Sequence, residues 1–184
     1  MTAAELRAKL STLVHTPLAV ADHRQAAVLV ALEPGRGVWL TRRTNDLPNH
    51  AGQVAFPGGK IETFDQSPEA AALREAWEEI GLAPAAVELL GRMDDHITGT
   101  GFHIAPVVGL ITPGMVFHPA PGEVAAVFCL GFDVLLNPQA PQRRTLTMRG
   151  EERAVWVWPH TDHFIWGATA AILVNLAQLV RGAA

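Results

Sequence analysis

Three glutamates on a predicted helix are the residues in this chain best suited to chemistry. Glu75, Glu78 and Glu79 follow Arg74 in the string REAWEE. At about 100° of rotation per helical residue, their carboxylates fall within an arc of about 100°. Like charges at this spacing cost roughly 0.2–0.5 kcal/mol per pair, so folding alone does not explain the cluster. Oxygen ligands without cysteine or histidine suit Mg²⁺ or Mn²⁺, and the pattern predicts a metal-dependent enzyme acting on phosphates.

Two consecutive glycines lie upstream of this helix. Gly58 and Gly59 follow a Phe-Pro pair. Glycine lets the backbone approach a ligand closely, and a backbone carbonyl there can complete a magnesium shell. Each feature also has a simpler interpretation: a solvated acidic face with an Arg74–Glu78 ion pair, and a tight turn between a strand and a helix. The loop and the helix together favour the metal site.

The helix that carries the glutamates has clear signals at both ends. Ser67 is a good N-cap, Pro68 suits the first helical position, and Gly81 suits the position just after the last turn. Small and apolar residues occupy the arc opposite the carboxylates. That face is expected to pack on a sheet while the carboxylates point into a cleft. Its members are Ala72, Leu73, Ala76, Trp77 and Ile80.

The rest of the chain alternates β-like runs with a helix near each end. No repeat or linker is visible, so residues 1–184 are expected to form a single domain. Strands flanked by helices predict an α/β layered sandwich. Helices are predicted at about 2–14 and 164–180 with a helical turn at 133–136, and strands at 25–32, 38–42, 53–56, 87–98, 102–111, 123–131, 143–149 and 153–158.

Composition excludes several classes of protein. The net charge is −4 and no Lys/Arg run exceeds two residues, which argues against nucleic-acid binding. Cys129 is the only cysteine, so no intramolecular disulfide can form, and its apolar neighbours favour a small core residue over a nucleophile. The N-terminus lacks a signal-peptide core, and Asn175 and Gln178 favour a buried last helix over a membrane span. We expect a cytoplasmic protein without membrane contact.

The remaining polar and aromatic residues carry weaker signals. His160 and His163 have metal-like spacing but no matching partners, which favours a helix-entry feature. His96 and His103 flank a turn and either line the cleft or lie on the surface. Three tryptophans are expected in the core or an interface rather than on a base-stacking platform: Trp156, Trp158 and Trp166.

The glycine loop and the helix together resemble a Nudix box, whose pattern is G-x5-E-x7-R-E-U-x-E-E-x-G-U with U a bulky apolar residue. Arg74-Glu75, Glu78-Glu79 and Gly81-Leu82 match its second half. The spacing from Gly59 to Arg74 is one residue longer than the general pattern, and Asp65 best matches the early glutamate. The resemblance, over about residues 59–82, implies a Nudix-type α/β/α sandwich with a mixed sheet and a loop-helix-loop catalytic motif.

A second motif is similar to that of the coenzyme A diphosphatase branch, in which the longer spacing is usual. Enzymes of this branch carry L-L-T-x-R-S/A-x3-R-x3-G-x3-F-P-G-G, and this chain reads WLTRRTNDLPNHAGQVAFPGG. Pro48 replaces the second arginine, so a cation expected to meet substrate phosphate is missing. DDHITGTGFHIAPVVG and IWGATA are also similar to segments of the branch.

The resemblance implies a role for each matching residue. Glu75, Glu78 and Glu79 bind Mg²⁺ or Mn²⁺ with a carbonyl of Gly58 or Gly59, and Arg74 holds a carboxylate in place. Glu123 is the candidate for a further metal-binding acid, or else a solvated acid at a strand end. Arg43 is the first candidate for substrate phosphate, and Arg42 or Lys60 the weaker ones. Side chains alternate along a strand, so Arg42 and Arg43 should point to opposite faces.

The substrate implied by the resemblance is coenzyme A or acyl-CoA. Water would attack the diphosphate linkage and give 3′,5′-ADP and 4′-phosphopantetheine or its acyl derivative. Pro48 keeps another nucleoside diphosphate derivative open, such as ADP-ribose, NADH or a dinucleotide. A non-catalytic nucleotide sensor is a third interpretation, which the presence of all three helix glutamates disfavours. Many proteins of the family are dimers, so a homodimer is one option.

Overall fold

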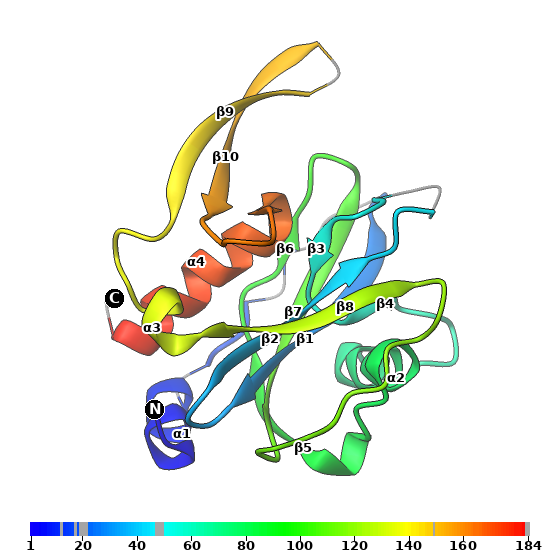
Figure 1. The fold of residues 1–184 in the computed structure, drawn as a ribbon. Helices are drawn as coiled ribbons and strands as arrows, with labels where there is room; N and C mark the ends of the chain where they lie inside the picture. The colour runs from blue at the N-terminus through cyan, green and yellow to red at the C-terminus, as the bar shows by residue number, and fades with distance from the viewer. Residues whose placement is uncertain (12, 17, 19–21, 47–49, 149, 183–184) are drawn as a thin grey trace.

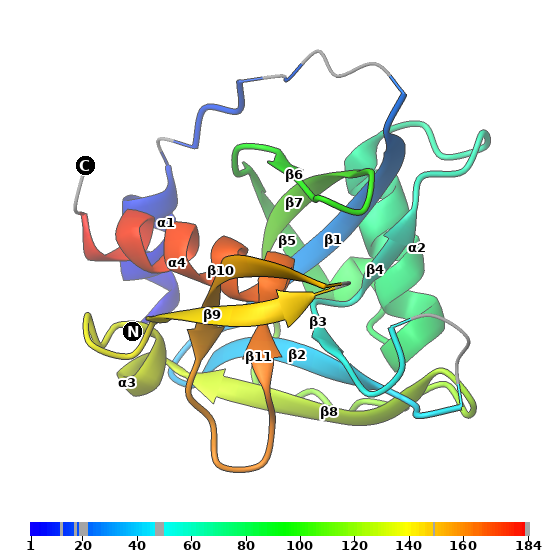
Figure 2. The ribbon, with the colours of Figure 1, turned by 90° about the horizontal axis from the view of Figure 1, so that it is seen from above.

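Helices cover both faces of a mixed β-sheet. The computed structural model describes residues 1–11, 13–16, 18, 22–46, 50–148 and 150–182. The helix α2 (Pro68–Ile80) lies on one side of the central strands, and α1 (Ala3–Leu10) and α4 (Gly167–Arg181) lie on the other (Figures 1 and 2). This arrangement is the predicted α/β/α sandwich.

The central sheet is built around β1 (Arg24–Glu33). One edge of β1 pairs in parallel with β7 (Phe102–Ile111), which in turn pairs with the antiparallel strands β5 (Val87–Arg92) and β6 (His96–Ile97). The parallel pair makes the sheet mixed, as predicted.

The other edge of β1 is shared between two strands, so the sheet divides there. Near its start, β1 pairs with β4 (Gly58–Lys60), and only at its end does it pair with β2 (Gly37–Arg43). The strand β2 then continues the sheet with β8 (Val124–Gly131) and the short β3 (Val54–Ala55). The division leaves the end of β2 beside the glycine loop.

A second sheet has three strands: β9 (Gln142–Met148), β10 (Glu151–Trp158) and β11 (Ile165–Trp166). The β9–β10 hairpin extends away from the body of the protein (Figure 1). A 3₁₀ turn, η1 (Pro84–Ala86), follows α2, and the short α3 (Phe132–Leu135) follows β8.

Small residues bring α2 close to the sheet. Ala27 and Ala31 of β1 meet Ala72 and Ala76 of the helix in one buried cluster, and all four are 0% exposed. Alanine on both surfaces lets the helix axis approach the strands closely. The helix ends as predicted: the Ser67 side chain accepts a hydrogen bond from the backbone N–H of Ala70, and Gly81 is left-handed with φ 70°.

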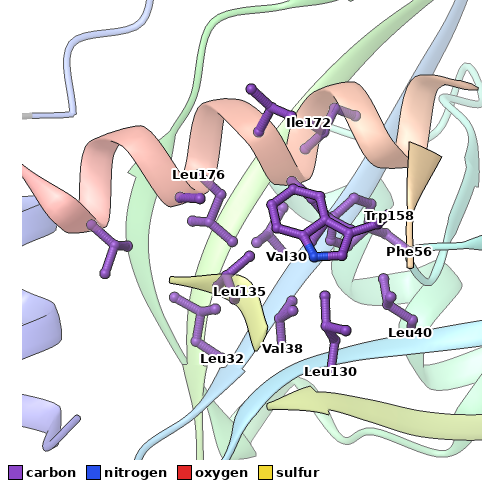
Figure 3. Packing of buried hydrophobic residues seen from close by; sticks show 14 of the residues in the cluster. Val30, Leu32, Val38, Leu40, Phe56, Leu130, Leu135, Trp158, Ile172 and Leu176 are labelled. Atoms are coloured by element: carbon purple, nitrogen blue, oxygen red, sulfur yellow. The ribbon is translucent and has the colours of Figure 1, made fainter. Parts of the chain in front are cut away.

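The opposite face of β1 carries larger side chains. Val28, Val30 and Leu32 alternate with the alanines and face the second hydrophobic cluster, which includes α1 and α4. Figure 3 shows the Trp158 indole in this cluster, with Ile172 of α4 on one side and Leu40 on the other. Trp158 is 1% exposed, which confirms the prediction that it is a core residue.

Three sequence-based expectations need correction. The first helix covers Ala3–Leu10 rather than 2–14, and Val14 is 81% exposed although Leu6 and Leu10 are buried. The last helix begins at Gly167 rather than 164, because Ile165 and Trp166 form the strand β11. Trp77 does not pack on the sheet: it is 54% exposed, while the smaller alanines make the contact.

The predicted last helix is not a membrane span. Among the residues that the structure describes, no helix combines the length and the apolar character needed to cross a bilayer.

The close α2–sheet contact can be tested by overpacking. Ala72→Leu would insert three carbons where the alanine is fully buried, and the free energy of unfolding should fall by about 1–3 kcal/mol. Ala8→Leu, the same change at an exposed position of α1, is the control and should alter stability by less than about 0.5 kcal/mol. Urea unfolding measures both variants. If Ala72→Leu were as stable as the wild type, the helix and the sheet would not be closely packed at this position.

Candidate active site

The Arg74 guanidinium is the centre of a hydrogen-bond network at the start of the site. Its Nε and Nη2 donate to Asp65 Oδ1 and Oδ2 at 3.0 and 2.9 Å, and Nη2 also donates to the Lys60 carbonyl at 3.1 Å. Its Nη1 donates to Glu75 Oε1 at 2.9 Å and Glu78 Oε2 at 3.0 Å. One side chain therefore ties two helix carboxylates to the loop after β4, which extends the predicted pairing of Arg74.

Asp65 anchors this network from the loop side. The forked contact with Arg74 lowers the pKa of the Asp65 carboxyl below its ordinary value, and the same contact raises the pKa of Arg74. The sequence motif places Asp65 at the position of the early glutamate without indicating its task. The structure shows that task to be the positioning of Arg74.

Glu79 is the most deeply buried acid of the site. Its side chain accepts a hydrogen bond from the backbone N–H of Gly58 at 3.1 Å, and Arg43 Nη1 lies 3.8 Å from its Oε1. Burial is the main reason that its pKa rises to about 7, and the neighbouring charges of Glu75 and Glu123 raise it further. The Gly58 N–H and Arg43 act in the opposite direction. The local positive charge does not balance the carboxylates.

A side chain at Gly58 would collide with the backbone of β1, and one at Gly59 would displace the Glu75 carboxylate. A Cβ at Gly59 would lie 2.5 Å from Glu75 Cδ, and one at Gly58 would lie 2.6 Å from the Cα of Val28 in β1. Real Cβ atoms do not come this close to other atoms. The glycines therefore let the loop run between the sheet and the glutamates of α2, as the sequence suggested.

Arg42 and Arg43 lie on opposite faces of β2. Leu40 belongs to the cluster under α4, whereas Trp39 belongs to the cluster under α2. Regular alternation up to Arg42 gives this residue the face of Leu40, whereas the pairing of β2 with β8 shifts between Arg42 and Arg43, so the face of Arg43 follows from its contacts. Arg43 pairs with Glu79 of α2, which places its side chain on the face of Trp39. The predicted opposite placement of the two side chains agrees with this contact, and Arg42 instead lies close enough to His163 to lower the pKa of its ring.

Glu123 contributes a fourth acid from outside the helix. It is exposed, it lies immediately before β8, and its backbone carbonyl accepts a hydrogen bond from the Thr44 N–H at 3.0 Å. Its charge raises the pKa values of both Glu75 and Glu79. The side chain therefore acts on the helix acids electrostatically, which agrees with its choice as a further acidic candidate.

The donor set suits a hard divalent cation, although it is not arranged around one. Within the described ranges, no three His, Cys, Asp or Glu side chains form a group that could hold a metal ion. Glu75 and Glu78 instead face Arg74, and Glu79 faces Gly58. All the acids offer oxygen. Burial is the main cause of the raised pKa values of Glu75 and Glu79, and repulsion from neighbouring acids, which a positive charge would offset, raises them further. A magnesium-like ion would supply that charge.

The other candidate residues lie elsewhere. His103 is buried and its Nε2 lies 2.7 Å from Asp95 Oδ2, so it does not line the carboxylate site. Burial raises the pKa of the Cys129 thiol to about 11, in agreement with a packing role. Pro48, which replaces the arginine of the second motif, lies outside the described residues.

His160 and His163 form a contact that the sequence did not reveal. The His163 ring stacks on Phe128 of β8, with ring centroids 3.8 Å apart, and His160 meets the same phenyl ring edge-on. The HxxH spacing is visible in the sequence, but Phe128, the partner of both histidine rings, lies about 30 residues away in the chain, on β8.

Removing the charge of Glu79 should stabilise the metal-free protein above neutral pH. The folded pKa of about 7 exceeds the ordinary 4.5, so the proton contributes stability that is complete below about pH 4.5 and lost as the pH rises through about 7. Glu79→Gln keeps an acceptor for Gly58 but cannot ionise. Its free energy of unfolding with EDTA should exceed that of the wild type by about 1–3 kcal/mol at pH 8, and much less at pH 5. Urea unfolding at the two pH values measures this difference, and an equal effect at both would contradict the assigned burial.

Comparison with known proteins bears on the family of this chain. Residues 22–161 match the model of the NUDIX domain family. Proteins described as uncharacterized Nudix hydrolase NudL, from Escherichia fergusonii and Escherichia coli K12, are 41% identical over 158 residues, which is 85% of this chain and 82% of each relative.

Solved structures show the same fold at lower sequence identity. A Caenorhabditis elegans Ap4A hydrolase in a binary complex is 12% identical with a TM-score of 0.54, and the match covers 85% of this chain and 93% of that one. A Chromobacterium violaceum protein described as a putative nudix hydrolase family member is 21% identical with a TM-score of 0.52, over 86% and 79% of the two chains. With its glycine loop, its helix glutamates and the family match over most of its length, the chain belongs to the Nudix hydrolases, enzymes that act on phosphoric anhydrides.

Proposed function

We propose that this Nudix hydrolase cleaves the diphosphate linkage of coenzyme A or acyl-CoA. The observation that carries the proposal is the placing of Arg43 on the same face as the buried Glu79, with the two side chains 3.8 Å apart. Arg43 belongs to the second motif, and Glu79 belongs to the Nudix box. A residue of the substrate-recognising motif thus meets a residue of the catalytic motif.

The acids of α2 would hold the divalent ion. Glu75, Glu78 and Glu79 supply carboxylate oxygens, the Gly58 carbonyl is a further candidate, and Glu123 approaches from the residue before β8. Mg²⁺ or Mn²⁺ bound there would neutralise charge on the diphosphate and lower the pKa of a water molecule. Arg74 is the positioning residue, because its Nη1 donates hydrogen bonds to Glu75 and Glu78 and so fixes both carboxylates.

The reaction requires a proton acceptor and a phosphate contact. Water forms a new P–O bond, the P–O–P bridge breaks, and the bridging oxygen leaves on the second phosphate. A site carboxylate accepts the proton of the water, and a general base of this kind contributes about 10²–10⁴-fold. Arg43 would meet the substrate phosphates: its Nε is buried and has no hydrogen-bond partner, so this donor is available to an anion.

The second candidate is hydrolysis of another nucleoside diphosphate derivative, such as ADP-ribose, NADH or a dinucleotide. The observation in its favour is Pro48, which removes one cation from the coenzyme A motif. A non-catalytic sensor is less favoured, because all three helix glutamates are present.

Product analysis distinguishes these candidates. With Mg²⁺ or Mn²⁺, coenzyme A should give 3′,5′-ADP and 4′-phosphopantetheine, identified by mass spectrometry, and EDTA should abolish both. Glu79→Gln should show no turnover at saturating metal. ADP-ribose and NADH, tested in parallel, should remain intact. Cleavage of either one in place of coenzyme A would refute coenzyme A as the substrate but would still agree with hydrolysis of a diphosphate.

Arg74→Lys tests the positioning role. Lysine keeps the charge but cannot make the forked contact with Asp65 while reaching Glu75 and Glu78. We expect kcat to fall about 10- to 100-fold, as for the loss of other supporting partners of metal ligands. The metal concentration for half-maximal activity should rise as well. Arg144→Lys, on the exposed β9, is the control, and unchanged kinetics in Arg74→Lys would contradict the role.

A further inference from the structure

Three aromatic rings and an arginine gather on the face of β2 that is turned away from the helix glutamates. Arg42 lies close enough to His163 to lower the pKa of its ring, and the His160 ring lies beside that of His163. Phe128 of β8 stacks on His163 with ring centroids 3.8 Å apart and planes inclined by 23°, and the two histidine rings lie 4.9 Å apart. We call these four residues the Arg42 cluster. The proposed reaction does not use any of them.

The basic groups of the cluster influence one another. Burial lowers the pKa of His163, and the charges of His160 and Arg42 lower it further, while Asp162 alone among the neighbours named here acts to raise it. His160 and Arg42 are therefore each close enough to His163 to disfavour the charged form of its ring. An anion at this position would relieve the repulsion.

Unpartnered polar atoms lie within the cluster. Arg42 Nε and His163 Nδ1 are buried and have no hydrogen-bond partner. Buried polar groups are usually satisfied, so two such atoms in one cluster indicate a missing partner. The backbone N–H of Asp162 donates to His160 Nδ1 at 3.1 Å. A neutral His160 therefore carries its proton on Nε2, which is then a second available donor.

The cluster lies at the same strand end as the proposed active site. Arg42 and Arg43 are consecutive, and their side chains leave β2 on opposite faces. Their Cα atoms are about 3.8 Å apart. Arg43 pairs with Glu79 on one face, and Arg42 meets the histidines on the other. A ligand with two separate phosphate groups can therefore contact both sides of this strand end.

We propose that the Arg42 cluster is a subsite for a phosphate monoester of the substrate, separate from the diphosphate that is cleaved. This inference rests on the proposed function, because coenzyme A carries a 3′-phosphate besides its diphosphate. Arg42, His160 and His163 supply the donors, and the Phe128 ring supports the His163 imidazole. The subsite also offers a cation where Pro48 has removed one from the recognition motif.

The binding test compares 3′,5′-ADP with 5′-AMP by isothermal titration calorimetry in EDTA, so that no turnover is needed. The wild type should bind 3′,5′-ADP at least about 10-fold more tightly, as expected for a charge-assisted phosphate contact. Arg42→Gln should reduce the ratio of the two affinities to near one, and Arg42→Lys should restore part of it. Arg144→Gln, the same charge change on β9, should leave the ratio unaltered. A ratio that persists in Arg42→Gln overturns the subsite, as does a wild type that binds both ligands equally.

A second measurement does not depend on the folding of an arginine variant. The pKa of His163 in the wild-type protein, followed by NMR of the ring protons, should rise on addition of 3′,5′-ADP and not on addition of 5′-AMP. His163→Phe, which keeps a ring against Phe128, should also lower the preference for 3′,5′-ADP. A His163 pKa that responds alike to both ligands overturns the proposal.

Kinetics separate the failure of this proposal from the failure of the proposed function. The kcat/KM for coenzyme A should exceed that for dephospho-coenzyme A in the wild type, and the two values should converge in Arg42→Gln. Cleavage of both substrates with equal kcat/KM in the wild type retains the function and overturns the subsite. Preferential binding of 3′,5′-ADP without cleavage of coenzyme A supports the subsite and refutes the function.

Discussion

The contact between α2 and β1 positions the rest of the site. Ala27 and Ala31 on the strand share a buried cluster with Ala72 and Ala76 on the helix, and their small side chains let the two elements pack closely. At this short separation, Glu79 is buried and reaches the backbone N–H of Gly58. The burial raises the pKa of the carboxyl to about 7. The packing of small residues thus buries a carboxylate close to other acids, an arrangement that suits a divalent cation.

Arg74, which Asp65 holds in place, balances part of the negative charge of the helix acids. The guanidinium satisfies Glu75 and Glu78 on the helix, and the carboxylate of Asp65 holds the guanidinium from the loop. The negative charge of Glu79 is compensated more weakly, because Arg43 Nη1 lies 3.8 Å from Glu79 Oε1. The two arginines therefore have different roles. Arg74 maintains the geometry of the acids, and Arg43 remains available for an anionic substrate.

The division of the sheet gives β2 two functional faces. Because β1 pairs with β4 at one end and with β2 at the other, the last residues of β2 lie beside the glycine loop. Arg43 extends from there towards Glu79, and Arg42 extends towards His163. These two consecutive arginines therefore lie in different surroundings, one beside a carboxylate and the other beside a histidine. This arrangement links the proposed cleavage site to the proposed phosphate subsite through a single strand end.

The sequence by itself determined the Nudix box, the limits of α2 and the opposite faces of Arg42 and Arg43. These features follow from local rules: Ser67 and Gly81 mark helix ends, and side chains alternate along a strand. Only the tertiary structure decided that Glu79 is buried, that Trp77 is exposed, and that His163 stacks on Phe128. Each of these depends on contacts between segments distant in sequence, and the periodicity of a helix shows which residues share a face but not how closely a sheet approaches it.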